Sequence, residues 1–294
     1  MNEVLFVLKN KKNRRGKSEP SPNFSSQHLL FHKPLIHEMI RLAHITPMDT
    51  VMDIGAGKGA ITLPLAEKAG RVLAVENDPV YAEKLALKMR DIPNVRVKQA
   101  DILQTDLPKV PFSVVSNIPF SITTPILEKL LHHPGVPLKC AVLIIEKGAA
   151  RRFTSVPVTD PRILKWRMWF DFQVVRTVSP EHFSPRPRVD SAVMIIRKKK
   201  NPEISPAEHA KFSALASQAL RQPKMPLSAA LGDIFTPVQI TRLAGLLNLN
   251  RDAPIGTLNE RQWGTVFRSM VQYAPPHRRP RLPKNGFKKN KHRR

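Results

Sequence analysis

The sequence contains a single cysteine, Cys140, among its 294 residues. One cysteine excludes an intrachain disulfide and a cysteine-cluster metal site, and we expect no bound metal. Long apolar runs are also missing. The longest strong one, residues 140–145, is far shorter than the ~20 residues that span a membrane. The apolar start at residues 4–8 is too short for a secretory signal. We therefore expect a cytoplasmic protein with no membrane partner.

Acidic residues are scarce: 23 Asp and Glu face 48 Lys and Arg, which gives a formal net charge of +25. Segments 9–17 and 277–294 are rich in Lys and Arg and contain no acid. The chain between them still has more cations than acids. Such an imbalance favours a polyanionic partner, above all a nucleic acid.

Apolar periodicity predicts a regular alternation of strands and helices as far as residue 147. This alternation is typical of a mostly parallel sheet with helices on both faces, and two later strands are expected to form a hairpin. The predicted strands are 51–54, 71–75, 95–99, 112–115, 139–145, 173–178 and 192–197, and the predicted helices are 34–43, 60–68, 79–89, 124–132 and 147–153.

The pattern changes after a basic linker at 198–204. Only helical patterns follow, at 206–220, 226–231, 237–247 and 260–273, most of which begin near a proline or a polar cap. A chain of this length accommodates two domains. We predict a basic flexible arm (1–20), an α/β catalytic domain (21–200), a small helical RNA-binding domain (201–275) and a basic disordered tail (276–294).

A glycine loop, Gly55-Ala56-Gly57-Lys58-Gly59, lies between the first predicted strand and its helix. Glycines in that context let a ligand approach the backbone, although a tight turn alone also explains them. Glu76 ends the next strand, where a carboxylate is placed to bind ribose hydroxyls. Asp101 follows the third strand and is placed to accept a hydrogen bond from an adenine amino group. A helix cap or a surface charge is the alternative for either acid.

The stretch Ser116-Asn117-Ile118-Pro119-Phe120 ends a further buried strand. Pro119 pushes Ile118 toward an extended conformation, which turns its carbonyl outward beside the Asn117 amide. Two acceptors next to the Phe120 ring suit a planar group with an exocyclic amino group, such as adenine. A strand-ending turn with a core Phe is the alternative. Ligands of such sheets bind outside the carboxyl ends of the strands, where all these motifs lie.

With these residues in view, the chain resembles the rRNA adenine N6-methyltransferase family, and within it the Erm-type 23S rRNA (adenine-N6) methyltransferases of macrolide resistance. The resemblance covers about residues 21–273. Its carriers are Pro22-Asn23-Phe24, Asp53-Ile54-Gly55-Ala56-Gly57-Lys58-Gly59, Val75-Glu76, Asp101-Ile102, Asn117-Ile118-Pro119-Phe120 and His182-Phe183-Ser184-Pro185-Arg186-Pro187-Arg188-Val189-Asp190-Ser191.

The resemblance implies a Rossmann-like fold and the methyl donor S-adenosylmethionine (SAM). The donor-binding residues that it implies are Asn23, Ser25, Gly55, Gly57, Glu76, Asp101 and Asn117. It also implies that Asn117 and the Ile118 carbonyl bind the target amino group, and that Phe120 and Phe183 hold a flipped adenine between them. The sequence departs from the family's usual pattern at Pro22, Ser25 and Phe120.

The implied function is N6-methylation, with dimethylation expected, of one adenine in the peptidyl transferase loop of 23S rRNA. The product confers resistance to macrolide, lincosamide and streptogramin B antibiotics, and we expect a monomer. Three alternatives stay open: a 16S rRNA adenine dimethylase of ribosome assembly, a nicotinamide-dependent oxidoreductase with the same glycine loop, and a non-catalytic RNA-binding assembly factor.

Overall fold

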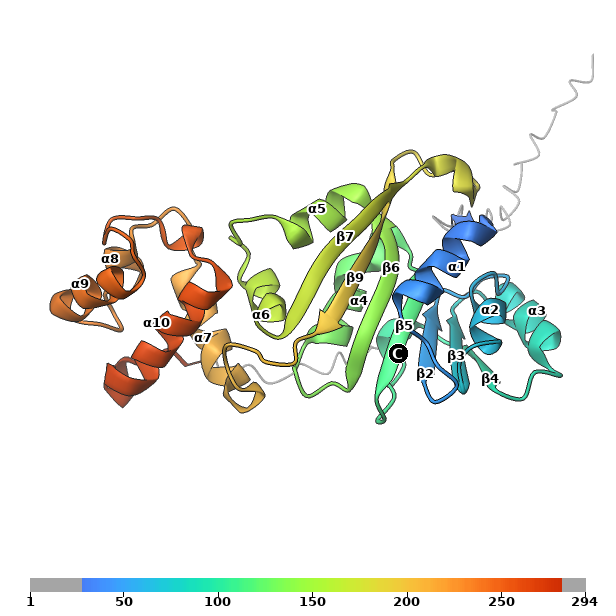
Figure 1. Ribbon diagram of the computed structural model, residues 1–294, viewed down its shortest axis with the longest axis horizontal. Helices are drawn as coiled ribbons and strands as arrows, with labels where there is room; N and C mark the ends of the chain where they lie inside the picture. The colour runs from blue at the N-terminus through green and yellow to red at the C-terminus, as the bar shows by residue number, and fades with distance from the viewer. Residues whose placement is uncertain (1–27, 282–294) are drawn as a thin grey trace, which may run out of the picture.

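A seven-stranded sheet crosses the centre of the protein in the computed structural model, which describes residues 28–281 (Figure 1). The strand order is β4-β3-β2-β5-β6-β9-β7, and β2 to β6 pair in parallel. β9 is antiparallel to both β6 and β7, which confirms the predicted hairpin. The strands are β2 (Thr50–Ile54), β3 (Arg71–Glu76), β4 (Val95–Gln99), β5 (Phe112–Asn117), β6 (Leu138–Glu146), β7 (Phe170–Val178) and β9 (Ser191–Lys198).

Helices cover both faces of this sheet, as predicted. Alternate residues of a strand point to opposite faces, and β2 illustrates this: Val51 packs with α1 and α2, whereas Met52 packs with α4, α5 and α6. Helix α3 covers Ala74 of β3 on the α1 side. The helices are α1 (Lys33–Leu42), α2 (Thr62–Ala66), α3 (Pro79–Met89), α4 (Thr123–Leu131), α5 (Lys147–Thr154) and α6 (Pro161–Trp169).

The chain reverses its direction of travel across the sheet between β2 and β5. These two strands are neighbours, but β3 and β4 extend the sheet to one side of the pair and β6 extends it to the other. Connections that leave in opposite directions open a crevice at the carboxyl ends of the two central strands. The glycine loop follows β2 and Asn117 ends β5, so both lie at this crevice.

Beyond residue 201 the described chain contains helices and short 3-10 turns: α7 (His209–Ala219), α8 (Leu227–Ala230), α9 (Pro237–Leu246) and α10 (Glu260–Tyr273). These match the four predicted helices to within three residues at each end. Two of them begin with a capping box, in which the first side chain and the side chain three residues later bind each other's backbone. Such a box supplies partners for the free amides that begin a helix.

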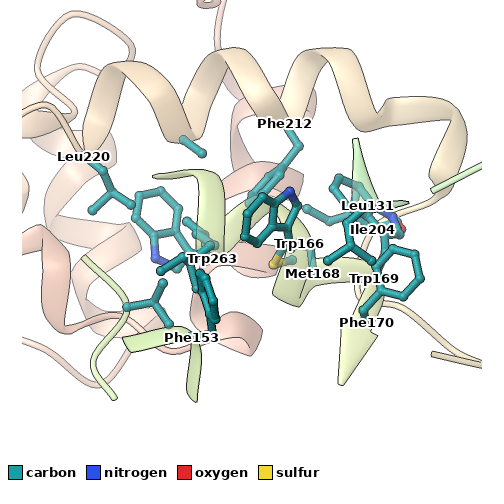
Figure 2. Close-up of a cluster of buried hydrophobic side chains, with 14 of the residues drawn as sticks. Leu131, Phe153, Trp166, Met168, Trp169, Phe170, Ile204, Phe212, Leu220 and Trp263 are labelled. Carbon is teal, nitrogen blue, oxygen red and sulfur yellow. The ribbon is translucent and has the colours of Figure 1, made fainter. Parts of the chain in front are cut away.

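The helical part shares one continuous apolar core with the α4–α6 face of the sheet (Figure 2). Trp169 of α6 lies between the two parts: its ring centroid is 5.7 Å from that of Phe212 in α7, and its Nε1 donates to the Ile204 carbonyl oxygen at 2.9 Å. Figure 2 shows Phe212 pointing from its helix toward Trp166 and Trp169. We name this cluster of Trp166, Trp169, Phe170, Phe212 and Trp263 the joint core.

The chain ends lie partly outside the described residues. The predicted arm (1–20), Asn23, Ser25 and residues 282–294 all fall there. The predicted disordered tail begins too early, because residues 276–278 form a 3-10 turn and Arg279 is packed against α10. Its guanidinium donates to the carbonyl oxygens of Ala274 and Val271 at 2.8 and 2.9 Å, and so supplies partners for the free carbonyls that end a helix.

Residues 28–281 lack two features, a membrane-spanning helix and a cluster of metal-ligating side chains. None of the helices there is both long and apolar enough to cross a membrane. Within the same range, no three His, Cys, Asp or Glu side chains are grouped so that they could hold a metal ion.

Candidate active site

The glycine loop after β2 requires its three glycines. Gly55, Gly57 and Gly59 have φ angles of +71°, +52° and +81°, a region in which a side chain is strained. Space is short as well: a Cβ on Gly57 would lie 2.8 Å from Leu29 Cδ2, and one on Gly59 would lie 2.5 Å from Leu85 Cδ1. The loop is therefore a tight turn, and its backbone at Gly55 also lies open to neighbouring cavities.

Glu76 holds the glycine loop in place. Its Oε2 accepts a hydrogen bond from the Gly57 amide at 2.7 Å, and its Oε1 accepts one from the Asp78 amide at 2.8 Å. The residue is only 1% exposed. A carboxylate oxygen can accept more than one hydrogen bond, so bracing the loop and binding a hydroxyl are compatible. No sequence signal indicates this contact with the loop.

Asp101 comes to the same place from the next strand. It caps a 3-10 turn (Ile102–Gln104), with Oδ1 accepting from the Leu103 amide at 2.8 Å. Capping a helix and lining a ligand site are therefore compatible for Asp101. It is a cap, and it also lines a cavity of about 200 Å³ with Glu76 and Gly55. The structure brings these three predicted residues together.

Asn117 carries an unpaired acceptor. Its Nδ2 donates to the His28 carbonyl oxygen at 2.7 Å, whereas its buried Oδ1 has no hydrogen-bond partner among residues 28–281. A buried acceptor without a partner is costly and uncommon in folded proteins. Asn117 lines a small cavity with Gly55, Gly57 and Phe120. Asn117 is therefore prepared to accept a hydrogen bond from something that enters this cavity.

His28 is a residue that sequence reasoning missed. Its carbonyl orients the Asn117 amide, its Nδ1 lies 2.9 Å from the Pro185 carbonyl oxygen, and its ring centroid lies 5.8 Å from that of Phe120. It thereby connects Asn117 and Phe120 to the proline-arginine loop at 185–190. No sequence signal marks this residue, because its partners are 89 and 157 positions away.

The two predicted stacking rings differ in exposure. Phe120 is half-buried and lines the small cavity with Asn117. Phe183 is 1% exposed and packs in the core with Leu30, because β8 (Phe183–Ser184) pairs with β1 (Leu29–Leu30). In this conformation Phe183 is a core residue and not the second wall of an open base pocket. A stacking role for it stays a prediction that requires this small sheet to open.

Asp53 is a buried carboxylate beneath the glycine loop. Its Oδ2 accepts from the Thr62 hydroxyl at 2.7 Å, and it is 1% exposed. Burial raises the pKa of Asp53 to about 7, and the nearby Glu76 carboxylate adds to the rise, while hydrogen bonds from Thr62 and Ser116 oppose it. The sequence marked this residue only as part of the glycine motif.

The site residues fit an adenosine-bearing cation such as SAM. A Cβ on Gly57 would clash with Leu29, which lines two of the cavities, two carboxylates line the 200 Å³ cavity, and Asn117 offers an orphaned acceptor next to them. A glycine loop, an acid after the second strand and an open switch point on a mostly parallel sheet are features of nucleotide-type ligand sites. The strand order and this site define a Rossmann-like methyltransferase.

Comparison with known proteins identifies the family. The model of the ribosomal RNA adenine dimethylase family matches residues 22–272, and the chain belongs to this family. It is 46% identical over 284 residues to an rRNA adenine N-6-methyltransferase of Bacillus licheniformis, which covers 97% of this chain and 98% of the relative. Its reaction class is therefore the SAM-dependent methylation of adenine N6 in ribosomal RNA.

Two further comparisons place the fold and the family's range. The solved 23S rRNA methyltransferase ErmE superposes with a TM-score of 0.74 at 24% identity, over 83% of this chain and all of the other. A ribosomal RNA small subunit methyltransferase A of Picosynechococcus is 31% identical over 81% of this chain and 92% of its own length. The first shows the shared fold, and the second shows that the family includes proteins named for the other ribosomal subunit.

Proposed function

We propose that the protein methylates N6 of one adenine in the peptidyl transferase loop of 23S rRNA, twice in succession, and thereby confers resistance to macrolide, lincosamide and streptogramin B antibiotics. The orphaned Oδ1 of Asn117 carries this proposal. The Bacillus relatives, at 46% identity over nearly the whole chain, support the choice of the N-6-methyltransferase branch.

The chemistry asks for an acceptor at this position. An adenine amino group is a poor nucleophile, because its lone pair is delocalised into the ring. An acceptor that binds one of its hydrogens favours a tetrahedral nitrogen, and a fixed dipole stabilises the positive charge that develops there. We assign this role to Asn117 Oδ1 and to the Ile118 carbonyl. The bound SAM supplies an activated methyl group, and the proton of the methylated nitrogen becomes acidic enough to leave without a dedicated base.

His28 fixes the direction of the Asn117 amide. Because Nδ2 donates to the His28 carbonyl at 2.7 Å, the amide is held from turning over, and Oδ1 is left without a partner among residues 28–281. Preorganisation of this kind removes the cost of orienting a dipole during the reaction. Since His28 also lies against the Phe120 ring, the acceptor and the stacking surface are held by one residue.

The donor is assigned to the neighbouring cavity. Glu76 would bind the ribose hydroxyls and Asp101 the adenine amino group of SAM, because both line the 200 Å³ cavity next to Gly55. Gly55 and Gly57 let the donor approach the loop. Asn23 and Ser25 stay predicted donor contacts, and both lie outside the described residues. A target adenine must leave its stack to reach Asn117, and Phe120 offers it one stacking face.

Exposed cations flank the crevice and suit an RNA backbone. Arg151 and Arg152 of α5 are exposed, and Arg152 is oriented by the Thr124 hydroxyl at 3.0 Å and by the Phe153 ring. Arg186 and Arg188 are exposed on the proline-arginine loop. That loop is held by an ion pair between Lys147 and Asp190 at 2.9 Å. Phosphate contacts by such residues make RNA affinity strongly dependent on salt.

The function is tested by primer extension across the peptidyl transferase loop of 23S rRNA from cells with and without the gene. A gene-dependent stop at one adenine, together with macrolide resistance, is the expected result. Modification of 16S rRNA with unmodified 23S rRNA would instead assign the protein to ribosome assembly. If neither 23S nor 16S rRNA is modified, the protein would instead have a non-catalytic role.

A further inference from the structure

Phe120 gives a flipped adenine one aromatic face, and the opposite face is unassigned. Enzymes that flip a base hold it by stacking between aromatic or apolar side chains. Phe183, the other predicted ring, is 1% exposed and packs with Leu30, because β8 pairs with β1. To reach a base, it would have to part these strands and give up the burial of a whole aromatic side chain. A residue that already lies at the cavity supplies the second face more simply.

His28 lies at that place. It is half-buried and lines the same small cavity as Asn117 and Phe120. Its ring centroid is 5.8 Å from that of Phe120, with an angle of 43° between the ring planes. Stacked planes touch at about 3.5 Å, so two rings that hold a base between them are about 7 Å apart. A further separation of about 1 Å, with a rotation that brings the two planes parallel, therefore admits a base.

Contacts from three parts of the chain hold His28 in place. Its carbonyl oxygen accepts from Asn117 Nδ2 at 2.7 Å, and its Nδ1 lies 2.9 Å from the Pro185 carbonyl oxygen. A carbonyl oxygen can only accept, so Nδ1 carries the hydrogen of this second bond. The next residue, Leu29, pairs with Ser184 in the small sheet. A ring that is fixed before the ligand arrives loses little conformational freedom on binding.

The Phe120 ring makes no hydrogen bond, so it can turn while His28 stays fixed. Resting on the proposed function, we propose that the His28 imidazole is the second wall of the target-base pocket. The flipped adenine then stacks between His28 and Phe120, with its amino group at Asn117. His28 thus has two separable roles, because its backbone carbonyl orients the Asn117 amide and its ring holds the base. A substitution of the side chain removes the ring and leaves that carbonyl in the chain.

RNA binding by the full chain tests this inference, in the presence of saturating S-adenosylhomocysteine, which is the donor without its methyl group. The probes are two hairpins of the peptidyl transferase loop that differ only at the target position, which carries adenine in one and no base in the other. Both hairpins make the same phosphate contacts, so the ratio of their affinities reports on contacts to the base. Binding of the hairpin without the base also shows that each variant is folded.

We expect His28→Gln to lower this ratio about five- to tenfold, the lower part of the range for loss of one base–aromatic stack, since imidazole is a small ring. Glutamine keeps an amide donor for the Pro185 carbonyl but has no ring. His28→Phe is the matched variant, because it keeps a ring and loses the donor, and it should keep the wild-type ratio.

His132→Gln controls for the loss of a histidine elsewhere. His132 follows α4 and is exposed, and its Nδ1 likewise lies 2.9 Å from a backbone carbonyl oxygen, that of Lys129. This variant should also keep the wild-type ratio.

Two results overturn the inference alone, provided that the wild type methylates the adenine hairpin. One is a wild-type ratio in His28→Gln. The other is an equal fall in His28→Gln and His28→Phe, which would show that the ring itself does not hold the base. A wild type that binds neither hairpin, or that leaves the adenine unmethylated when SAM is supplied, overturns the inference and the proposed function together.

Discussion

The crevice at β2 and β5 contains strained backbone and unpaired polar groups, whereas the joint core consists mainly of closely packed apolar rings. At the crevice, three glycines have positive φ, Asp53 is buried without a cation and Asn117 keeps an unpaired acceptor. In the joint core, Trp169 and Phe212 are buried in apolar contact and the Trp169 indole finds its acceptor, whereas the buried Trp263 Nε1 has no partner among residues 28–281. The crevice keeps polar groups ready for ligands at a cost in stability, whereas the joint core supplies stability.

The largest expected effect comes from the joint core. Phe212→Ala removes a ring that is 0% exposed and contacts both Trp169 and Phe267. We expect a loss of about 3–5 kcal/mol in the free energy of unfolding, as for other buried aromatic truncations. Urea denaturation measures it. Methyl transfer per folded molecule at low temperature should stay close to the wild type; a loss of turnover in fully folded protein would contradict the division between the two regions.

A substitution at the crevice should have the opposite result, a large loss of turnover with little change in stability. Asn117→Ala should lower methyl transfer about 10²–10³-fold, as removal of one preorganised polar contact does. Unfolding free energy should change little, because the variant loses one hydrogen bond and also removes an unpaired acceptor.

Asn94→Ala is the matched control. The Asn94 side chain donates to the carbonyl oxygens of Ala66 and Ala69 at 2.8 and 2.9 Å, far from the crevice. This variant should lose stability and keep its turnover. Denaturation curves and single-turnover assays on both proteins decide, and equal effects on turnover would remove the special role of Asn117.

Phe120 tests the stacking face. Phe120→Ala should weaken the complex with substrate RNA by about 1–3 kcal/mol, the range for loss of one base–aromatic stack. Phe120→Tyr keeps the ring and should stay within about 0.5 kcal/mol of the wild type. Fluorescence titration with the RNA at one fixed salt concentration measures both. Similar losses in the two variants would mean that the ring does not stack on a base.

The smallest effects come from two glycines of different backbone conformation. Gly57→Ala, at a φ of +52° and with Leu29 in the way, should cost about 1–2 kcal/mol in stability and weaken binding of S-adenosylhomocysteine. Gly245→Ala lies inside α9 with nothing within 4 Å of the new Cβ, so it should stabilise by about 0.4–1 kcal/mol. Thermal denaturation of the pair shows whether the strain is specific to the loop.

Much of the sheet could be predicted, because its strands are short apolar runs bounded by Gly, Pro and polar residues. Glu76, Asp101 and Asn117 were found by one rule: in a parallel sheet, residues after strand ends meet at one edge. The strand–helix order alone was enough to predict that these three residues lie close together, without any knowledge of side-chain contacts.

The rest of the site depends on contacts between distant parts of the chain. His28 gains its role from Asn117 and Pro185, and Phe183 is buried because β8 pairs with β1. Both follow from packing that no local pattern encodes. The tail boundary was placed too early for a related reason: Arg279 looks like one more cation in a basic run, but its guanidinium binds two helix carbonyls.

The most direct test of the central claim is mass spectrometry of 23S rRNA nucleosides from cells that express the wild type or Asn117→Ala. Our account predicts N6,N6-dimethyladenosine at one adenine of the peptidyl transferase loop with the wild type, and unmodified adenine there with the variant at equal protein level. Full modification by Asn117→Ala, or no modified adenine in 23S rRNA with the wild type, would contradict it.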